Sequence, residues 1–233
     1  MLYLIGLGIN KEHITIGALE SANKCDELYL ENYTSLGLNK DELEKIFNKN
    51  IILAERDFVE NFDVKKAKSK NIGILVYGDI FSATTHVSLF LDCKKNKIGI
   101  KLINGISILT LIGNLGLNLY NFGKIVSVPF QKDVDLVDSL EKNNELHTLF
   151  LLDLDTKNKK FLSINEGVER LLKQGMKDRL CIGIERLGFK DEKIVVKNAR
   201  ELVKVKFEKY PQCFIVPGKM HFVEEEMLEQ WKK

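Results

Sequence analysis

The sequence predicts an α/β protein built from two α/β domains with mainly parallel or mixed sheets. Short apolar runs alternate with amphipathic stretches along the whole chain, which is typical of repeated strand–helix units. Runs that are apolar throughout, such as residues 74–76, indicate strands buried on both faces of a parallel sheet. A turn-like Asn-Gly pair follows the first group of strands, and we therefore expect domains at 1–105 and 106–233.

In the first half, each strand is expected where an apolar run is short, and each helix where apolar residues recur every three or four positions. Asn39 and Glu42 form a capping-box pattern that opens one helix, with Leu43, Ile46 and Phe47 facing inward. The expected strands are 2–5, 27–30, 51–53, 72–77 and 98–103, and the other expected helices are 15–24, the basic stretch 58–70 and 82–93.

The second half alternates less regularly. Ser163 and Glu166 form another capping box, and the helix that follows is expected to end near Gly175. Its apolar face is formed by Val168, Leu171 and Leu172. An acidic helix is expected from Met220 onward, and strands are expected at 125–128, 148–152, 180–184 and 214–216.

Composition excludes several classes of protein. The 35 Lys and Arg against 33 Asp and Glu give a net charge of +2, which argues against a protein that binds nucleic acid directly through excess charge. The four cysteines are scattered in apolar runs without a CxxC pair, so we expect buried thiols in a reducing compartment and no metal site. The apolar run at 1–8 lacks a basic flank and is too short for a membrane span, so we expect a cytoplasmic protein without a membrane partner.

Polar residues and glycines follow three of the expected strands. Gly6 and Gly8 end the first, Gly78-Asp79 ends the fourth, and Asn104-Gly105 follows the fifth. Open α/β sheets bind ligands at the carboxyl ends of their strands, so these three ends would form a pocket if their strands are parallel neighbours. Lys at position 11 rules out the dinucleotide-binding glycine fingerprint, and the pattern does not identify the ligand.

Each candidate also has a structural explanation. Asp79 or Ser82 could simply cap the following helix, and His86 is more often a hydrogen-bonded helix residue than a base. Asp153 and Asp155 precede several lysines and are expected in a solvated turn. The lysine-rich stretch 64–70 is expected to be a solvated helix face, and Lys219 follows a Pro-Gly turn with its side chain free to meet an anion.

Several stretches in order along the chain resemble the diphthine synthase family, in the tetrapyrrole-methylase-like superfamily of S-adenosylmethionine-dependent methyltransferases. The resemblance covers essentially the whole chain, and the motifs are specific in combination rather than singly. They are LYLIGLG (2–8), IT and ALE (14–20), ENYTS (31–35), GD and ATTH (78–86), GIS (105–107), YNFGK (120–124), LHTLFLLD (146–153) and IVPGKMHFVE (215–224).

The resemblance implies two α/β domains with the cofactor in the cleft between them, and a homodimer. It implies transfer of methyl groups from S-adenosylmethionine, leaving S-adenosylhomocysteine. The implied substrate is translation elongation factor 2, whose modified histidine carries a 3-amino-3-carboxypropyl group. Methylation of that amino group to the trimethylammonium form gives diphthine, a step of diphthamide biosynthesis.

Carried over residue by residue, the resemblance implies a set of cofactor contacts. Gln212 stands where the family usually has histidine, Ile80 stands where many relatives have proline, and 129–137 lacks an expected aromatic segment that would bear on substrate docking. The implied contacts are Ile9, Asp79, Ser82, Ser107, Ile108, Leu152, Leu187 and Gln212.

The expected chemistry needs no catalytic triad. Methyl transfer from a sulfonium requires a neutral amine aligned with the methyl group, and an ordinary α-amino group has a pKa of about 7.7–8.0. We therefore assign no general base. Two alternatives stay open from the sequence: a methylase acting on a porphyrinoid ring carbon, and a cofactor-binding or interaction protein that no longer transfers methyl groups.

Overall fold

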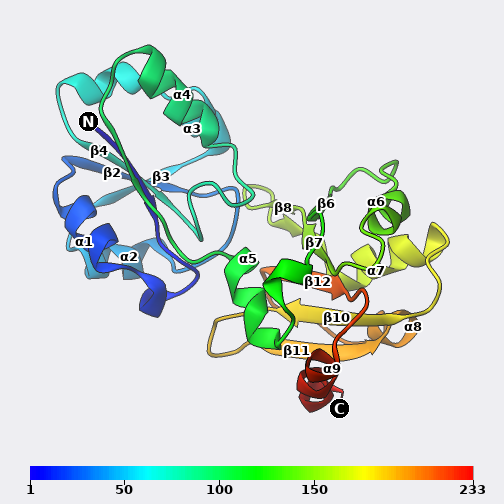
Figure 1. The fold of residues 1–233 in the computed structure, drawn as a ribbon. Coiled ribbons are helices and arrows are strands. Elements are labelled where there is room, and N and C mark those ends of the chain that lie inside the picture. Colours follow the sequence, from blue (N-terminus) through cyan, green and yellow to red (C-terminus); the bar gives the residue numbers. More distant parts are fainter. Residues whose placement is uncertain (233) are drawn as a thin grey trace. The chain divides into compact units, whose positions relative to one another are not determined.

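Two five-stranded sheets organise the chain, one in each of two units, Met1–Leu109 and Thr110–Lys233 (Figure 1). The structure is a computed structural model that describes residues 1–232. One sheet is wholly parallel and the other is mixed, which confirms the predicted α/β class.

The first sheet has the strand order β3-β2-β4-β1-β5, with every pair parallel. Strands β1 and β4 lie inside the sheet and are buried at every residue, as their uninterrupted apolar sequences predict. The edge strand β3 exposes two of its four residues. The bounds are β1 Leu2–Gly6, β2 Glu27–Glu31, β3 Ile51–Ala54, β4 Ile72–Val76 and β5 Ile100–Ile103.

Helices cover both faces of this sheet (Figure 1). On one face, α1 (Ile16–Asn23) and α2 (Lys40–Phe47) pack on residues such as Ile5 and Leu28. On the other, α3 (Arg56–Glu60), a 3-10 helix (Val64–Lys68) and α4 (Val87–Lys95) pack on residues such as Leu4 and Ile74. Each face of the sheet therefore has its own apolar core, and loops follow the carboxyl ends of the strands.

Three helix predictions need correction. The capping box at Asn39 and Glu42 is present. Of the three residues predicted to face inward, Leu43 and Phe47 are buried, but Ile46 is 36% exposed. The stretch 58–70 is not one helix but the end of α3 and a 3-10 helix. Helix α4 begins at Val87 instead of residue 82, because the preceding segment forms a loop.

The second sheet has the order β11-β10-β12-β7-β6, in which only β6 and β7 are parallel. Helices α6 (Leu136–Lys142), α7 (Ile164–Lys173) and α8 (Ala199–Leu202) share an apolar core with one of its faces. The capping box at Ser163 is present, as predicted. The strands are β6 Val126–Val128, β7 Thr148–Leu152, β10 Leu180–Glu185, β11 Lys193–Asn198 and β12 Gln212–Val216.

Shorter elements complete the chain. Helix α5 (Ile108–Leu111) follows the first sheet, and 3-10 helices lie at Ile112–Leu115 and Leu119–Asn121. A hairpin of β8 (Leu154–Asp155) and β9 (Lys160–Phe161) stands where a solvated turn was predicted. The chain ends with α9 (Phe222–Leu228) and a 3-10 helix (Glu229–Trp231). Within residues 1–232, no helix has the length and apolar character needed to cross a membrane.

Candidate functional site

The three strand ends predicted to form a pocket lie together in the first unit. Gly8 and Gly78 pair through two backbone hydrogen bonds of 3.1 and 2.9 Å. A Cβ at Gly105 would lie 2.2 Å from the carbonyl oxygen of Gly78 and 2.8 Å from the nitrogen of Gly8. Glycine is therefore required for this close backbone approach, which confirms that the strand ends meet at one rim.

Asp79 joins two of these strand ends. Its Oδ1 accepts hydrogen bonds from the Phe81 amide (3.0 Å) and the Ser82 hydroxyl (3.1 Å). Its Oδ2 accepts from the Asn104 side chain (2.9 Å) and the Gly105 amide (3.3 Å). Burial favours the neutral acid, but these four donors outweigh burial and lower the pKa of Asp79. The carboxylate is thus ionised and fixed at the centre of the rim, and it does not cap a helix.

Of the other predicted cofactor residues of the first unit, Ser82 contacts Asp79 directly and Ser107 lies next to Gly78, with 3.7 Å between the Ser107 Cα and a Cβ placed on the glycine. The Ser107 hydroxyl oxygen accepts a hydrogen bond of 3.2 Å from the Leu109 amide. Ile9 directly follows Gly8 and Ile108 directly follows Ser107, and both are half-buried. The five predicted residues of the first unit therefore lie at the rim or next to a residue that forms it.

The three remaining predicted residues lie at the same end of neighbouring strands in the second sheet. Gln212 begins β12 opposite Glu185 at the end of β10, and Leu187 lies two residues beyond that strand end. Leu152 ends β7, the antiparallel neighbour of β12. The Gln212 amide accepts from Ile164 N and donates to the Lys209 carbonyl, both at 2.9 Å, so its side chain already has partners within the unit.

Two buried residues near the first rim form a pair that the sequence did not predict. Glu31 ends β2 and is 0% exposed, and His86 precedes α4 and is 1% exposed. The His86 Nε2 atom lies 3.5 Å from Glu31 Oε2. The only sequence signal was that both lie in polar runs after apolar strands, ENYTS and ATTH. That signal places each residue at a strand end, but it does not pair them.

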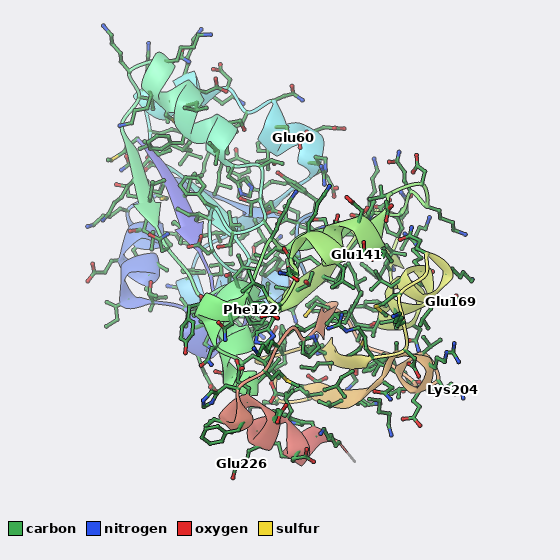
Figure 2. The ribbon with its side chains drawn as sticks, turned by 45° about the vertical axis from the view of Figure 1, so that its right-hand side comes forward. Glu60, Phe122, Glu141, Glu169, Lys204 and Glu226 are labelled. Atoms are coloured by element: carbon green, nitrogen blue, oxygen red, sulfur yellow. The ribbon has the colours of Figure 1, made fainter. Side chains whose placement is uncertain are left out.

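A second buried pair lies in the second unit. The Nε2–H group of His147 donates to Glu224 Oε1 at 3.1 Å, and its Nδ1 accepts from the Gly218 amide at 3.0 Å. The ring of Phe122, labelled in Figure 2, packs edge-on against His147 with 5.2 Å between centroids. His147 therefore contacts Phe122, Gly218 and Glu224. These contacts join three of the stretches that carry the resemblance, 120–124, 146–153 and 215–224. Lys219 is exposed beside them, as predicted.

Metal ligands do not gather anywhere in the described part of the chain, residues 1–232, where no group of three or more His, Cys, Asp or Glu side chains could hold an ion. The four cysteines are buried and free, and burial raises the pKa of the Cys25 and Cys93 thiols to about 11. These thiols are therefore protonated at neutral pH and behave as small apolar side chains.

Known proteins resemble this chain over its whole length. The family "Tetrapyrrole (Corrin/Porphyrin) Methylases" matches residues 1–203. A diphthine methyl ester synthase of Dictyostelium discoideum is 34% identical over 268 residues, covering 100% of this chain and 98% of the relative. A diphthine synthase of Methanocaldococcus jannaschii is 36% identical over 251 residues, covering 98% of each.

Solved structures agree with the sequence comparison. The crystal structure of a putative diphthine synthase from Entamoeba histolytica has a TM-score of 0.90 and 33% identity, and the match covers 100% of this chain and 98% of that one. Another diphthine synthase structure has a TM-score of 0.92 and 32% identity, covering 99% of this chain and 95% of that one. These matches in sequence and in fold show that the chain belongs to the diphthine synthases, within the tetrapyrrole methylase family of methyltransferases.

Proposed function

We propose that this methyltransferase of diphthamide biosynthesis uses S-adenosylmethionine to methylate translation elongation factor 2. The acceptor is the amino group of the 3-amino-3-carboxypropyl chain on its modified histidine, and S-adenosylhomocysteine is the second product. The names of the relatives support the reaction. The rim around Asp79 supports the binding of a polar cofactor in the first unit.

The observation that carries this proposal is the backbone cradle at the strand ends. The absence of a Cβ at Gly6 and Gly105 lets the three strand ends pack directly on one another, so that backbone groups form the rim at the carboxyl ends of the strands, where open α/β sheets bind ligands. The four donors hold the ionised Asp79 carboxylate in place, and its negative charge complements the positive charges of the cofactor. The residues present therefore fit S-adenosylmethionine. Its bound form would supply the electrophilic methyl group.

Residues of both units are proposed to bind the cofactor. In the first unit these are Asp79 and the residues around it, and in the second they are Leu152, Leu187 and Gln212. Leu152 and Leu187 are apolar and retain 9% and 4% exposure at this end of the sheet. Because the Gln212 side chain has partners of its own, we propose that this residue contributes through its backbone. We also propose a cytoplasmic homodimer, as the resemblance implies.

Positioning is the main catalytic contribution in this proposal. Holding amine and methyl group in line is worth roughly 7–11 kcal/mol of the barrier in well-oriented reactions. The substrate amine titrates near neutral pH, since the pKa of an ordinary α-amino group is about 7.7–8.0, so part of it is neutral without an enzymic base. We assign no general base, and the chain's own residues bind, orient and exclude water.

The first experiment is calorimetry of the purified chain with S-adenosylmethionine and S-adenosylhomocysteine, followed by methyl transfer to elongation factor 2 that carries the aminocarboxypropyl group. Micromolar or tighter binding and transfer to the amino group are expected. Binding without transfer would favour a non-catalytic cofactor-binding protein. Absence of binding to both ligands would refute the proposed function.

The same assay decides which product forms. The relatives are named diphthine synthase or diphthine methyl ester synthase, and the two names differ by a methyl ester. Mild alkaline treatment removes an ester methyl group but leaves the methyl groups of a trimethylammonium. A product whose mass is unchanged by alkali is methylated only on the amino group. A product that loses one methyl group also carries the methyl ester.

A further inference from the structure

The segment 79–85 carries two of the proposed cofactor residues, Asp79 and Ser82, and contains neither helix nor strand. Ala83 adopts a positive φ of 60°, which is unfavourable for a residue with a Cβ. Such a segment keeps one conformation only where its neighbours fix it. The hydrogen bonds of Asp79 fix its beginning, so its end requires a second anchor.

His86 is that second anchor. Its Nδ1 atom lies 3.3 Å from the carbonyl oxygen of Ile80, which also accepts a 2.7 Å hydrogen bond from the Thr84 hydroxyl. Ile80 is fully buried in the core under α4, and the imidazole is 1% exposed. The contact of His86 with the Ile80 carbonyl therefore links the end of the segment to a buried residue near its beginning.

Glu31 lies on the opposite side of the ring. Its Oε1 accepts hydrogen bonds from the amides of Tyr33 (3.0 Å) and Thr34 (2.6 Å), and its Oε2 accepts one from the Thr34 hydroxyl (2.7 Å). These three donors hold the buried carboxylate in place, and its Oε2 lies 3.5 Å from His86 Nε2. The loop after β2 therefore borders the ring that closes the loop after β4.

Both ring nitrogens of His86 face oxygen atoms. Burial lowers the pKa of His86, and the nearby carboxylates of Glu31 and Glu60 (Figure 2) only partly oppose this effect. The neutral ring has one N–H, which the Ile80 carbonyl receives, while Nε2 has no hydrogen-bond donor in reach. The positive charge nearby is Arg56, which stacks on the Tyr33 ring at 4.9 Å. An amide at position 31 would supply the donor that Nε2 lacks.

We propose that His86, through its contact with the Ile80 carbonyl, is a positioning residue that holds the segment 79–85 in its cofactor-binding conformation. The inference rests on the proposed function for the identity of the ligand. Its structural part, the immobilisation of the segment, concerns the ligand-free chain and is tested separately.

The test combines amide hydrogen exchange of the ligand-free chain with calorimetry of S-adenosylhomocysteine. His86→Phe keeps a ring of similar size but removes both nitrogens, and amides of 79–85 are expected to exchange about tenfold faster. Cofactor-product affinity is expected to fall by a similar factor. Glu31→Gln supplies the missing donor to Nε2, so it is expected to slow exchange and to tighten binding. Lys95→Ala, at the exposed end of α4 and away from the segment, is the matched control and should change neither.

Unchanged exchange of 79–85 in His86→Phe would overturn the inference, as would a Glu31→Gln variant that loosens the segment as much as His86→Phe does. If His86→Phe does not fold, His86→Leu replaces it, because leucine also lacks both nitrogens and is smaller. The amides of 79–85 should then exchange faster than in wild type, and wild-type exchange would overturn the inference. A wild-type chain that does not bind S-adenosylhomocysteine would refute the proposed function, while the exchange result would still decide the positioning role.

Discussion

The side-chain amide of Asn104 donates a 2.9 Å hydrogen bond to Oδ2 of Asp79, and this contact joins the loops that follow β5 and β4. The two residues are 25 positions apart in the sequence. Since β1 lies between β4 and β5 in the sheet, the bond closes the rim across the end of β1. Cofactor binding should therefore depend on Asp79 both for its negative charge and for the shape of this rim.

Asp79→Ala is expected to weaken S-adenosylmethionine binding while leaving the fold intact. The substitution leaves four donors without their acceptor, and an unsatisfied partner costs roughly 1–3 kcal/mol, which corresponds to about a tenfold loss of affinity. Calorimetry gives the affinity, and circular dichroism checks the fold. Asp138→Asn, which removes only an exposed ion pair with Lys142, is the control. Equal affinity in Asp79→Ala and wild type would contradict the assignment.

Gly105→Ala tests the close approach of the strand ends. The new Cβ would meet the Gly78 carbonyl at 2.2 Å and the Gly8 nitrogen at 2.8 Å, and backbone atoms cannot move aside as a side chain can. A destabilisation of about 1–3 kcal/mol is expected in urea unfolding, together with weaker cofactor binding. In Gly17→Ala the new Cβ makes only ordinary contacts in α1, so the control should be neutral or slightly stabilising. Equal stability of the two variants would contradict the close-approach argument.

The rim is predictable from sequence because local patterns determine it. Strands β1 and β4 are apolar at nearly every position, and glycine or aspartate follows each of them closely. A parallel arrangement then brings the strand ends together without any further information. Strand β11 was not predicted because its apolar run is only three residues long and is flanked by Lys193 and Lys197, a pattern that suits a half-exposed edge strand and a surface loop equally well.

The buried pairs could not be predicted from sequence. His147 and Glu224 are 77 positions apart, and an acidic residue near the start of an amphipathic helix is ordinarily exposed. The late start of α4 has the same kind of cause. Residues 82–86 have no strong helix breaker, and contacts of Asp79, Thr84 and His86 hold them as a loop. Local helix propensity therefore does not predict the structure where contacts between residues distant in the sequence determine it.

His86 should make the first unit less stable as the pH falls. Because burial lowers its pKa in the folded state, the unfolded chain takes up a proton first, near the ordinary value of 6.5. The contribution of the neutral ring is complete above pH 6.5 and is lost as the pH falls toward the lower folded value. Urea unfolding at a series of pH values measures it, and His86→Phe should flatten the dependence in this range. A variant with the same pH profile as wild type would show that His86 does not titrate on unfolding.

Glu224 should give the second unit a separate acid sensitivity at lower pH. Burial tends to raise its pKa, but hydrogen bonds from the Asn118 and His221 amides and from His147 outweigh this and lower it below the usual 4.5. A carboxyl group whose pKa is lowered on folding stabilises the protein above its unfolded value, and this stabilisation is lost as the pH falls through the folded value.

Glu224→Gln places an amide N–H group against donors, so it should cost roughly 1–3 kcal/mol at about pH 7 and reduce the loss of stability below the ordinary pKa of 4.5. Urea unfolding followed by the fluorescence of Trp231, the single tryptophan and three residues beyond α9, reports on this part of the second unit. Glu225→Gln changes an exposed neighbour on the same helix and should have little effect. If the two variants unfold alike at neutral and at acid pH, the buried pair does not hold α9 in place.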